Sequence, residues 1–91
     1  MNFNEEIRKT MGSKMREARK KKGLTQEEVA EICNLDDKHI GKLERGEKTP
    51  LVTTLFKYWK ATDIDVNRLF QELDELERKL KSQHSSEVDS E

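Results

Sequence analysis

The sequence predicts an all-α domain of five helices, and its composition supports that class. The chain has 91 residues, which is room for one small domain. Charged residues make up 41% and hydrophobic residues only 32%, and one proline with four glycines is few for a turn-rich β fold. Such a chain can bury one compact core but cannot easily enclose the large dry cavity that most small-molecule enzymes need.

The first helix is expected over residues 4–22. Its apolar residues recur at intervals of four, four and three, which places them on one helical face: Ile7, Met11, Met15 and Ala18. Four bases at 19–22 and then Gly23 are signals that a helix ends there.

Two short helices follow, separated by three residues. Thr25 is expected to cap the second helix, with Glu28 as its capping-box partner, and Asn34 suits the left-handed turn after it. Asp36 caps the third helix, which ends before Gly46. The expected apolar face of the second helix consists of Val29, Ala30, Ile32 and Cys33.

The fourth helix is predicted over residues 52–61, with Leu55, Phe56 and Trp59 as its buried face. Asp65 caps a fifth helix that runs to about residue 81. Residues 82–91 are polar and without periodicity, so we expect a disordered tail. The expected organisation is a domain over 1–70, a helical extension over 71–81 and a tail over 82–91.

The net charge of −1 hides an uneven distribution. Residues 1–60 hold fourteen Lys/Arg and ten Asp/Glu, whereas residues 61–91 hold four and nine. Eight bases and one acid lie within residues 8–22. A segment this basic often faces a polyanion, although a solvated lysine-rich helix face is an equally open interpretation.

Other kinds of chemistry find little support in the sequence. A single cysteine, Cys33, permits no intramolecular disulfide, and His39 and His84 lack further ligands at metal spacing. The sequence contains no catalytic triad pattern and no glycine-rich phosphate loop, so we expect neither an enzyme nor a cofactor. No apolar run approaches the roughly 18 residues of a membrane span, and the N-terminus lacks a secretory signal. We therefore expect a cytoplasmic chain with no membrane partner.

Two short helices joined by a three-residue turn have the geometry of a helix-turn-helix, whose second helix enters the DNA major groove. The sequence carries Gly-Leu-Thr-Gln-Glu-Glu-Val-Ala at 23–30, Leu-Glu-Arg-Gly at 43–46 and Asp-Val-Asn-Arg-Leu-Phe at 65–70. With these motifs the chain resembles the phage-repressor/Cro-type (XRE-like) helix-turn-helix family over about residues 8–70.

The resemblance implies double-stranded DNA as the partner and assigns a set of DNA-binding positions: Thr25, Gln26, Asp37, Lys38, His39, Lys42, Arg45 and Lys48. It also implies a structural salt bridge between Arg19 and Glu44. Within the recognition helix, Lys38 can donate to guanine or phosphate and Asp37 can accept from cytosine N4, whereas Gly41 lets the backbone approach DNA closely. The chain departs from the family in having Asn34 in the turn and Leu51 at the usual capping serine, so the fourth helix could start at residue 53.

The fifth helix contains a heptad-type seam, namely Val66, Leu69, Leu73, Leu76 and Leu80. Its first half can cover the domain core. Its second half has no obvious partner in the chain, so we expect Leu73, Leu76 and Leu80 to form a homodimer contact, with Tyr58 or Phe56 adding to it. The competing interpretation is a helix folded back on its own domain.

These inferences predict a sequence-specific transcriptional regulator that represses by occupying a palindromic operator as a homodimer. The rival hypothesis is a protein-interaction module of the same fold, such as an antitoxin, adaptor or antirepressor. Asp36, Asp37 and the acidic last third of the chain favour the rival, which would bring a regulatory protein partner. Activation through contact with RNA polymerase is a third possibility that the sequence does not separate from repression.

Overall fold

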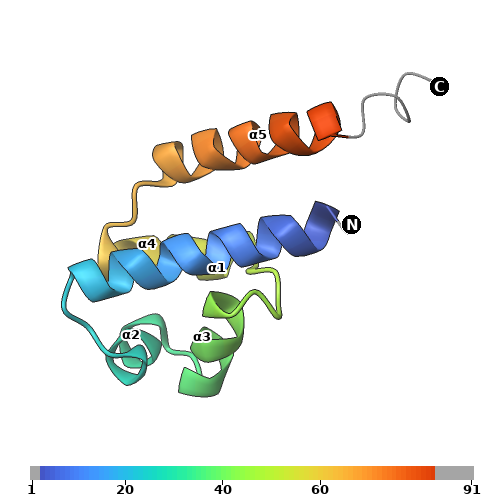
Figure 1. Ribbon diagram of the computed structural model, residues 1–91. Helices are drawn as coiled ribbons and strands as arrows, with labels where there is room; N and C mark the ends of the chain where they lie inside the picture. Colours follow the sequence, from blue (N-terminus) through green and yellow to red (C-terminus); the bar gives the residue numbers. More distant parts are fainter. Residues whose placement is uncertain (1–2, 84–91) are drawn as a thin grey trace.

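The computed structural model describes residues 3–83, and within them it has five helices and no strand (Figure 1). They are α1 (Phe3–Lys21), α2 (Gln26–Cys33), α3 (Asp37–Glu44), α4 (Val52–Thr62) and α5 (Val66–Gln83). The all-α prediction is therefore confirmed. Helix α5 extends two residues beyond its predicted end, and residues 84–91 of the expected tail lie outside the described residues.

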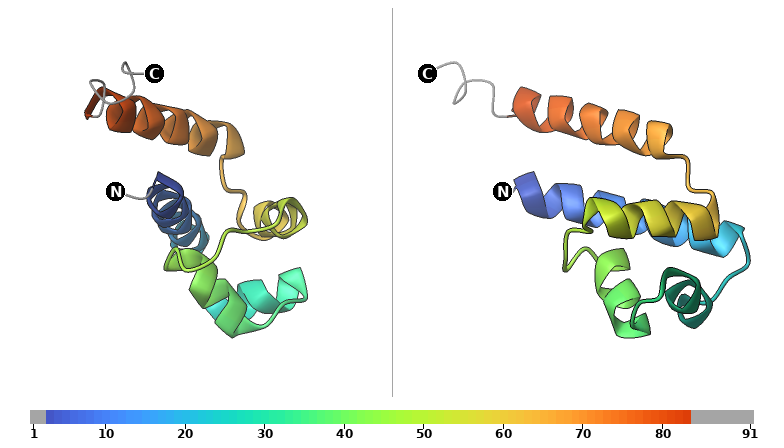
Figure 2. Two further views of the ribbon diagram at one scale, coloured as in Figure 1. Left: turned by 90° about the vertical axis from the view of Figure 1, so that its right-hand side faces the viewer. Right: turned by 180° about the vertical axis from the view of Figure 1, so that it is seen from behind.

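The long helix α1 is the centre of the arrangement. Helices α2 and α3 lie on one side of it, α5 lies on the opposite side and α4 lies beside it, as the two views of Figure 2 agree. Helix α5 runs antiparallel to α1 (Figure 1). None of the described helices is long and apolar enough to cross a membrane.

The helix boundaries follow the capping residues that the sequence supplies. The Thr25 hydroxyl accepts from the backbone N–H of Glu28 at 3.0 Å, and the Glu28 carboxylate accepts from the backbone N–H of Thr25 at 2.8 Å. Asn34 ends α2 in the left-handed conformation, with φ 56°. Asp36 caps α3 and Asp65 caps α5, each accepting a backbone N–H at 2.9 Å. The predicted capping box and caps are confirmed.

The core lies where α1, α2, α3 and α4 meet, with the start of α5 closing it. Its buried hydrophobic residues are Met11, Met15, Val29, Ala30, Cys33, Ile40, Leu43, Tyr58, Ala61, Ile64 and Leu69. Burial raises the pKa of the Cys33 thiol, although nearby Lys57 lowers it, so the thiol stays protonated.

The predicted buried face of α4 is confirmed in part for Leu55, which is half-buried and packs against the core, and is wrong for the two aromatic residues. Phe56 and Trp59 are 56% and 43% exposed, whereas Tyr58 is fully buried. The inward face of α4 consists of Thr54, Tyr58, Ala61 and Thr62. The polar atoms of this face find partners: the Thr62 hydroxyl donates to the Tyr58 carbonyl at 2.8 Å, and the Tyr58 hydroxyl meets acceptors in the core. Helix α4 also begins at Val52, one residue before the alternative start at residue 53.

Two smaller predictions also fail. Ile32, assigned to the buried face of α2, is 57% exposed, because Val29 and Cys33 already fill the side of α2 that faces the core. Tyr58, considered as a surface residue of a dimer contact, is instead among the largest fully buried side chains.

Helices α1 and α3 approach each other closely at Gly12. A Cβ atom on Gly12 would lie 2.4 Å from the carbonyl oxygen of Leu43 and 2.5 Å from that of Glu44. Both atoms belong to the backbone of α3, which cannot rotate away as a side chain can. Glycine at this position is thus what allows α3 to lie directly against α1.

We predict that Gly12→Ala lowers the free energy of unfolding by about 1–3 kcal/mol, because overpacking outweighs the better helix propensity of alanine. Urea unfolding followed by circular dichroism measures the change. The neighbouring Ser13→Ala, at an exposed position of the same helix, is the control and should change stability by less than about 0.5 kcal/mol. Equal stability of the two variants would contradict the close approach.

Candidate nucleic-acid interface

The turn between α2 and α3 fixes the orientation of the second helix. After Asn34, the backbone N–H of Leu35 donates to the carbonyl of Ala30 at 2.8 Å, and the chain reverses into α3. Ile40 and Leu43 on α3 are buried in the core. The opposite side of α3 is therefore presented to solvent, below α1 in Figure 1.

The structure places every predicted DNA-binding residue at least partly in solvent. Gln26 and His39 are half-buried, and the others are exposed: Thr25, Asp37, Lys38, Lys42, Arg45 and Lys48. Among these, Asp37 is an acid at the first position of α3, where it is favoured by the positive end of the helix dipole. The adjacent Asp36 is occupied in capping, and the backbone N–H of Lys38 lowers its pKa.

Arg45 and Gln26 come together over Gly41. A Cβ atom on Gly41 would lie 2.9 Å from Arg45 Nη1 and 3.5 Å from Gln26 Oε1. Gly41 itself is buried. The side chain of Arg45 thus lies across the Gly41 backbone, and DNA could approach that backbone closely only if Arg45 moved aside. What the missing side chain provides is space for a guanidinium group between α3 and the start of α2.

Arg45 also has an acidic partner that the sequence analysis did not include. Its Nε donates to Glu47 Oε2 at 2.6 Å, and both side chains are more than half exposed. This hydrogen bond raises the pKa of Arg45 and lowers that of Glu47. The sequence signal for this ion pair is the presence of opposite charges two residues apart, on either side of Gly46. In this structure the Arg45 guanidinium therefore already has a carboxylate partner.

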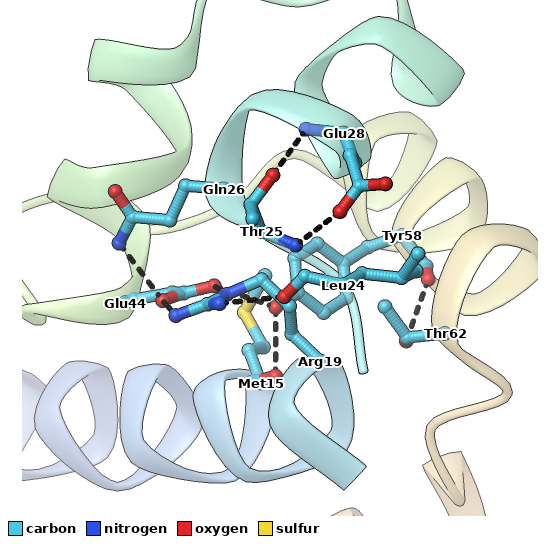
Figure 3. Close-up of polar contacts among 9 residues, drawn as sticks. All are labelled: Met15, Arg19, Leu24, Thr25, Gln26, Glu28, Glu44, Tyr58 and Thr62. Atoms are coloured by element: carbon cyan, nitrogen blue, oxygen red, sulfur yellow. Dashed lines mark hydrogen bonds and ion pairs between the residues drawn. The ribbon is translucent and has the colours of Figure 1, made fainter. Parts of the chain in front are cut away.

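Behind this surface lies a buried ion pair between Arg19 of α1 and Glu44 of α3 (Figure 3). Arg19 Nε donates to Glu44 Oε2 at 2.8 Å and Arg19 Nη2 to Oε1 at 3.0 Å, so the contact is bidentate. Arg19 Nη1 donates to the carbonyl of Leu24 at 2.8 Å. These are the two residues that the resemblance paired.

Two further side chains, which sequence analysis did not place here, complete the environment of Glu44. Gln26 Nε2 donates to Glu44 Oε1 at 3.1 Å. The Tyr58 hydroxyl lies 2.7 Å from both Glu44 Oε2 and the carbonyl of Met15, and its one proton can be donated to either acceptor. Figure 3 shows the group linking α1, α2, α3 and α4. One carboxylate therefore connects a proposed DNA-contacting residue, Gln26, to the core.

The electrostatics of the group follow from burial and hydrogen bonding. Burial raises the pKa of Glu44, but the donors on Arg19, Tyr58 and Gln26 outweigh it, so the net effect lowers this pKa. Burial first, and then the Glu44 carboxylate, raise the pKa of Tyr58 far above its usual range. Among the described residues no buried side-chain nitrogen or oxygen lacks a hydrogen-bond partner. Glu44 is therefore an anion at neutral pH.

The far half of α5 lies near α1 of its own chain. Leu73 packs against the core cluster, and Leu76 and Leu80 are half-buried. Lys14 of α1 and Glu72 of α5 form an ion pair at 3.2 Å. The residues expected to form a dimer seam thus have at least part of their surface covered within the chain.

A groove of about 910 Å³ lies between α1 and the start of α5, and its lining carries both charges. Lys22 pairs with Asp63, and Lys14 pairs with Glu17 as well as Glu72. Among the described residues no group of three or more His, Cys, Asp or Glu side chains is placed to hold a metal ion. The groove is thus lined by ion pairs that are exposed or half-buried.

The fold and the presented α3 define a class of protein, and comparison with known proteins agrees. A family model described as helix-turn-helix matches residues 15–69. The chain belongs to this helix-turn-helix family of transcriptional regulators.

Among its relatives is the helix-turn-helix-type transcriptional regulator y4dJ of Sinorhizobium fredii, which is 36% identical over 70 residues. That alignment covers 77% of this chain and 91% of y4dJ. The regulator ImmR of Bacillus subtilis is 31% identical over 70 residues, and the chain spans about half of its length (54%).

Solved structures of similar shape are also regulators. The restriction-modification controller protein C.AhdI of Aeromonas hydrophila has a TM-score of 0.62 and 34% identity, over 70% of this chain and 96% of that one. The clp gene regulator ClgR of Corynebacterium glutamicum has a TM-score of 0.68 and 28% identity, over 75% of this chain and 87% of that one.

We predict that Glu44→Gln lowers the free energy of unfolding by about 3 kcal/mol at pH 7, because it leaves the buried Arg19 without an anion. The depressed pKa of Glu44 means that its ionised form stabilises the fold above the unfolded-state pKa of about 4.3. The difference between wild type and variant should therefore be full at pH 7 and shrink as the pH falls below about 4.

Urea unfolding at pH 7, 5 and 3 measures this difference. The exposed Glu31→Gln on α2 is the control and should stay within about 0.5 kcal/mol of wild type. A difference for Glu44→Gln that is the same at pH 7 and pH 3 would show that the ion pair does not contribute as argued.

Proposed function

We propose that this protein is a sequence-specific regulator that binds double-stranded DNA with α3 in the major groove and represses transcription by occupying its operator. The observation that carries the proposal is the exposed side of α3, with Lys38 and Lys42, held on a core that buries its opposite side. A helix so presented after a tight turn has the docking geometry of a recognition helix.

The roles of the side chains follow from their chemistry and position. Lys38 and Lys42 donate to guanine or phosphate, and Asp37 accepts from cytosine N4. His39 donates or accepts according to its tautomer. Thr25 and Gln26 at the start of α2, and Arg45 and Lys48 after α3, lie where a helix-turn-helix meets the DNA backbone.

Gln26 is the most constrained of these side chains. Its amide nitrogen Nε2 donates one hydrogen to Glu44 Oε1, at an N–O distance of 3.1 Å. The second amide hydrogen and the amide oxygen of Gln26 are left for DNA. Because Glu44 is itself fixed by Arg19, the Gln26 amide is oriented before DNA arrives. A pre-oriented side chain loses less conformational entropy on binding.

The unit that we propose to contact DNA comprises residues 1–70, with the helical extension over 71–81 serving self-association. A homodimer would read two half-sites about one DNA turn apart, so the operator should be a near palindrome. A chain this small represses most simply by blocking access to a promoter.

A second candidate function is a protein-interaction module with weak or no DNA binding. The exposed Asp37 on α3 and the Glu47 carboxylate on Arg45 favour it, because both place negative charge where phosphates would lie. The two candidates differ in salt dependence, since DNA binding through phosphates releases counterions and weakens steeply as salt rises.

The testing experiment is selection of bound duplexes from a random DNA pool by the full chain, at low and moderate salt. Enrichment of a palindromic site supports the proposed regulator. Absence of enrichment at both salt concentrations would overturn it in favour of the interaction module, for which any DNA binding should be weak and should change little with salt.

We predict that Lys38→Ala and Lys42→Ala each weaken binding to the selected operator about tenfold, since a good base contact contributes about 1–3 kcal/mol. A lysine that contacts phosphate should in addition reduce the salt slope by about one. Fluorescence anisotropy titrations at several salt concentrations measure both quantities. Lys79→Ala on α5 removes the same charge away from α3 and should leave affinity within about twofold. Wild-type affinity in both α3 variants would contradict the assignment.

We predict that Glu47→Gln strengthens DNA binding, because Arg45 could then contact a phosphate without first breaking its ion pair with the Glu47 carboxylate. The gain should be about threefold or more, and similar for random duplex and for the operator, because phosphates are common to both. The same titrations measure it. Glu17→Gln, an exposed acid on the side of α1 that faces α5, is the matched control for the added net positive charge. Equal gains for the two variants would mean that only net charge matters.

A further inference from the structure

The outward face of α4 presents a stripe of large apolar side chains. Val52, Phe56 and Trp59 are 84%, 56% and 43% exposed, and their spacing of four and three residues places them on one side of the helix. The rings of Phe56 and Trp59 stack with centroids 5.9 Å apart. Exposed apolar side chains that lie together, in contrast to singly scattered ones, are a feature of interaction surfaces.

This apolar stripe has a basic rim. Helix α4 contains no Asp or Glu between Val52 and Thr62, but it contains Lys57 and Lys60. Lys60 Nζ lies 5.8 Å from the centroid of the Phe56 ring, so its charge is held beside the stripe. The ion pairs within the described residues include neither lysine.

Helix α5 carries the complementary charge on one flank. Phe70 is 56% exposed, and Asp74 and Glu77 follow it by four and seven residues, which places them on the same side of the helix. Glu72, which reaches Lys14 of α1, is about 200° around α5 from Phe70. The flank with Phe70, Asp74 and Glu77 therefore faces away from the Lys14 side.

The acids on this flank are exchangeable. Asp74 pairs with Arg78 at 2.9 Å and Glu77 with Lys81 at 3.9 Å, and all four side chains are at least 41% exposed. Ion pairs this exposed contribute little stability and can be replaced by new ones at an interface. The right-hand view of Figure 2, which shows the side opposite to that in Figure 1, has α4 in front and α5 above it.

We propose that a second copy of this chain occupies the stripe: α4 of one copy packs against the Phe70–Asp74–Glu77 flank of α5 in its partner, and reciprocally. A two-fold dimer requires a self-complementary surface, in which residue i contacts j and j contacts i. One basic aromatic half and one acidic aromatic half on each copy meet that requirement. This inference rests on the homodimer in the proposed function and assigns its contact surface to a face other than the leucine seam.

The leucine seam is the weaker alternative because its residues are already used. Leu69 is 1% exposed, and Leu73 packs on the core of its own chain. Leu76 and Leu80 are half-buried, whereas Phe56, Trp59 and Phe70 are each more than 40% exposed. The apolar area available to a partner is thus greater on α4 and the Phe70 flank.

The test uses two charge-reversal variants of the full chain. The first is Lys57→Glu with Lys60→Glu, and the second is Asp74→Lys with Glu77→Lys. In either variant alone, the proposed contact brings like charges together, so each dimer should be at least about tenfold weaker than wild type. In a mixture, each α4 meets an α5 flank of opposite charge, so the heterodimer should form with nearly wild-type affinity.

Sedimentation velocity of each variant and of their mixture, at a concentration where wild type is dimeric, gives the result. Restoration of the dimer only on mixing supports the α4-to-α5 contact. A variant that stays dimeric alone points to a contact of α4 with α4 or of α5 with α5 and overturns the inference. So does a mixture that stays monomeric, or a wild type that is monomeric at every concentration.

Circular dichroism checks that the variants keep their helices. If the α5 reversal loses helicity, Phe70→Ser replaces it: we expect a monomer, and a dimer would overturn the inference. Titration of each monomeric variant with a half-site duplex separates this test from the proposed function. If the variants bind the half-site but remain dimeric, the proposed contact surface is wrong and the proposed regulator stands. If wild type does not bind DNA, the proposed regulator itself is wrong.

Discussion

The carboxylate of Glu44 is the group on which the arrangement of four helices depends. It accepts from Arg19 of α1 and Gln26 of α2, and it lies within hydrogen-bond distance of the hydroxyl of Tyr58 on α4. A buried anion would be costly without these donors, but with them its ionised form is favoured. Since these three groups come from different helices, the one carboxylate connects α1, α2 and α4 to α3. The close packing at Gly12 then brings α3 against α1 near the same point.

This rigid interior contrasts with an exchangeable surface. The exposed ion pair of Arg45 with Glu47 contributes little to stability, and we propose that a DNA phosphate can take the place of the carboxylate. Gln26 belongs to both regions. Its amide nitrogen donates to Glu44, and its amide oxygen lies beside Gly41 of α3. A surface of this kind can change its charged residues while the orientation of α3 stays fixed by the interior.

Local features of this structure could be predicted from the sequence, whereas the choice of inward face on α4 could not. Thr25 with Glu28, Asn34 and Asp36 act on backbone groups within a few residues, so a local pattern identifies them. The inward side of α4 depends instead on where the Tyr58 hydroxyl finds an acceptor, which is set by Glu44 and Met15 far away in the chain. Likewise, Gly41 is covered because Arg45 folds back over it, a contact that propensity does not encode.

The burial of Tyr58 has a consequence on the opposite side of its helix. Positions two before and one after it are rotated by about 200° and 100°, so a helix that points Tyr58 inward must direct Phe56 outward and Trp59 to its flank. The polar network therefore places aromatic surface in solvent, where hydrophobicity alone would bury it. The fold of a single chain does not depend on burying this apolar stripe, because the core is complete without it. The stripe therefore remains available for contact with another surface. The residues that fix the core and those that we propose for self-association are thus opposite faces of the same helix.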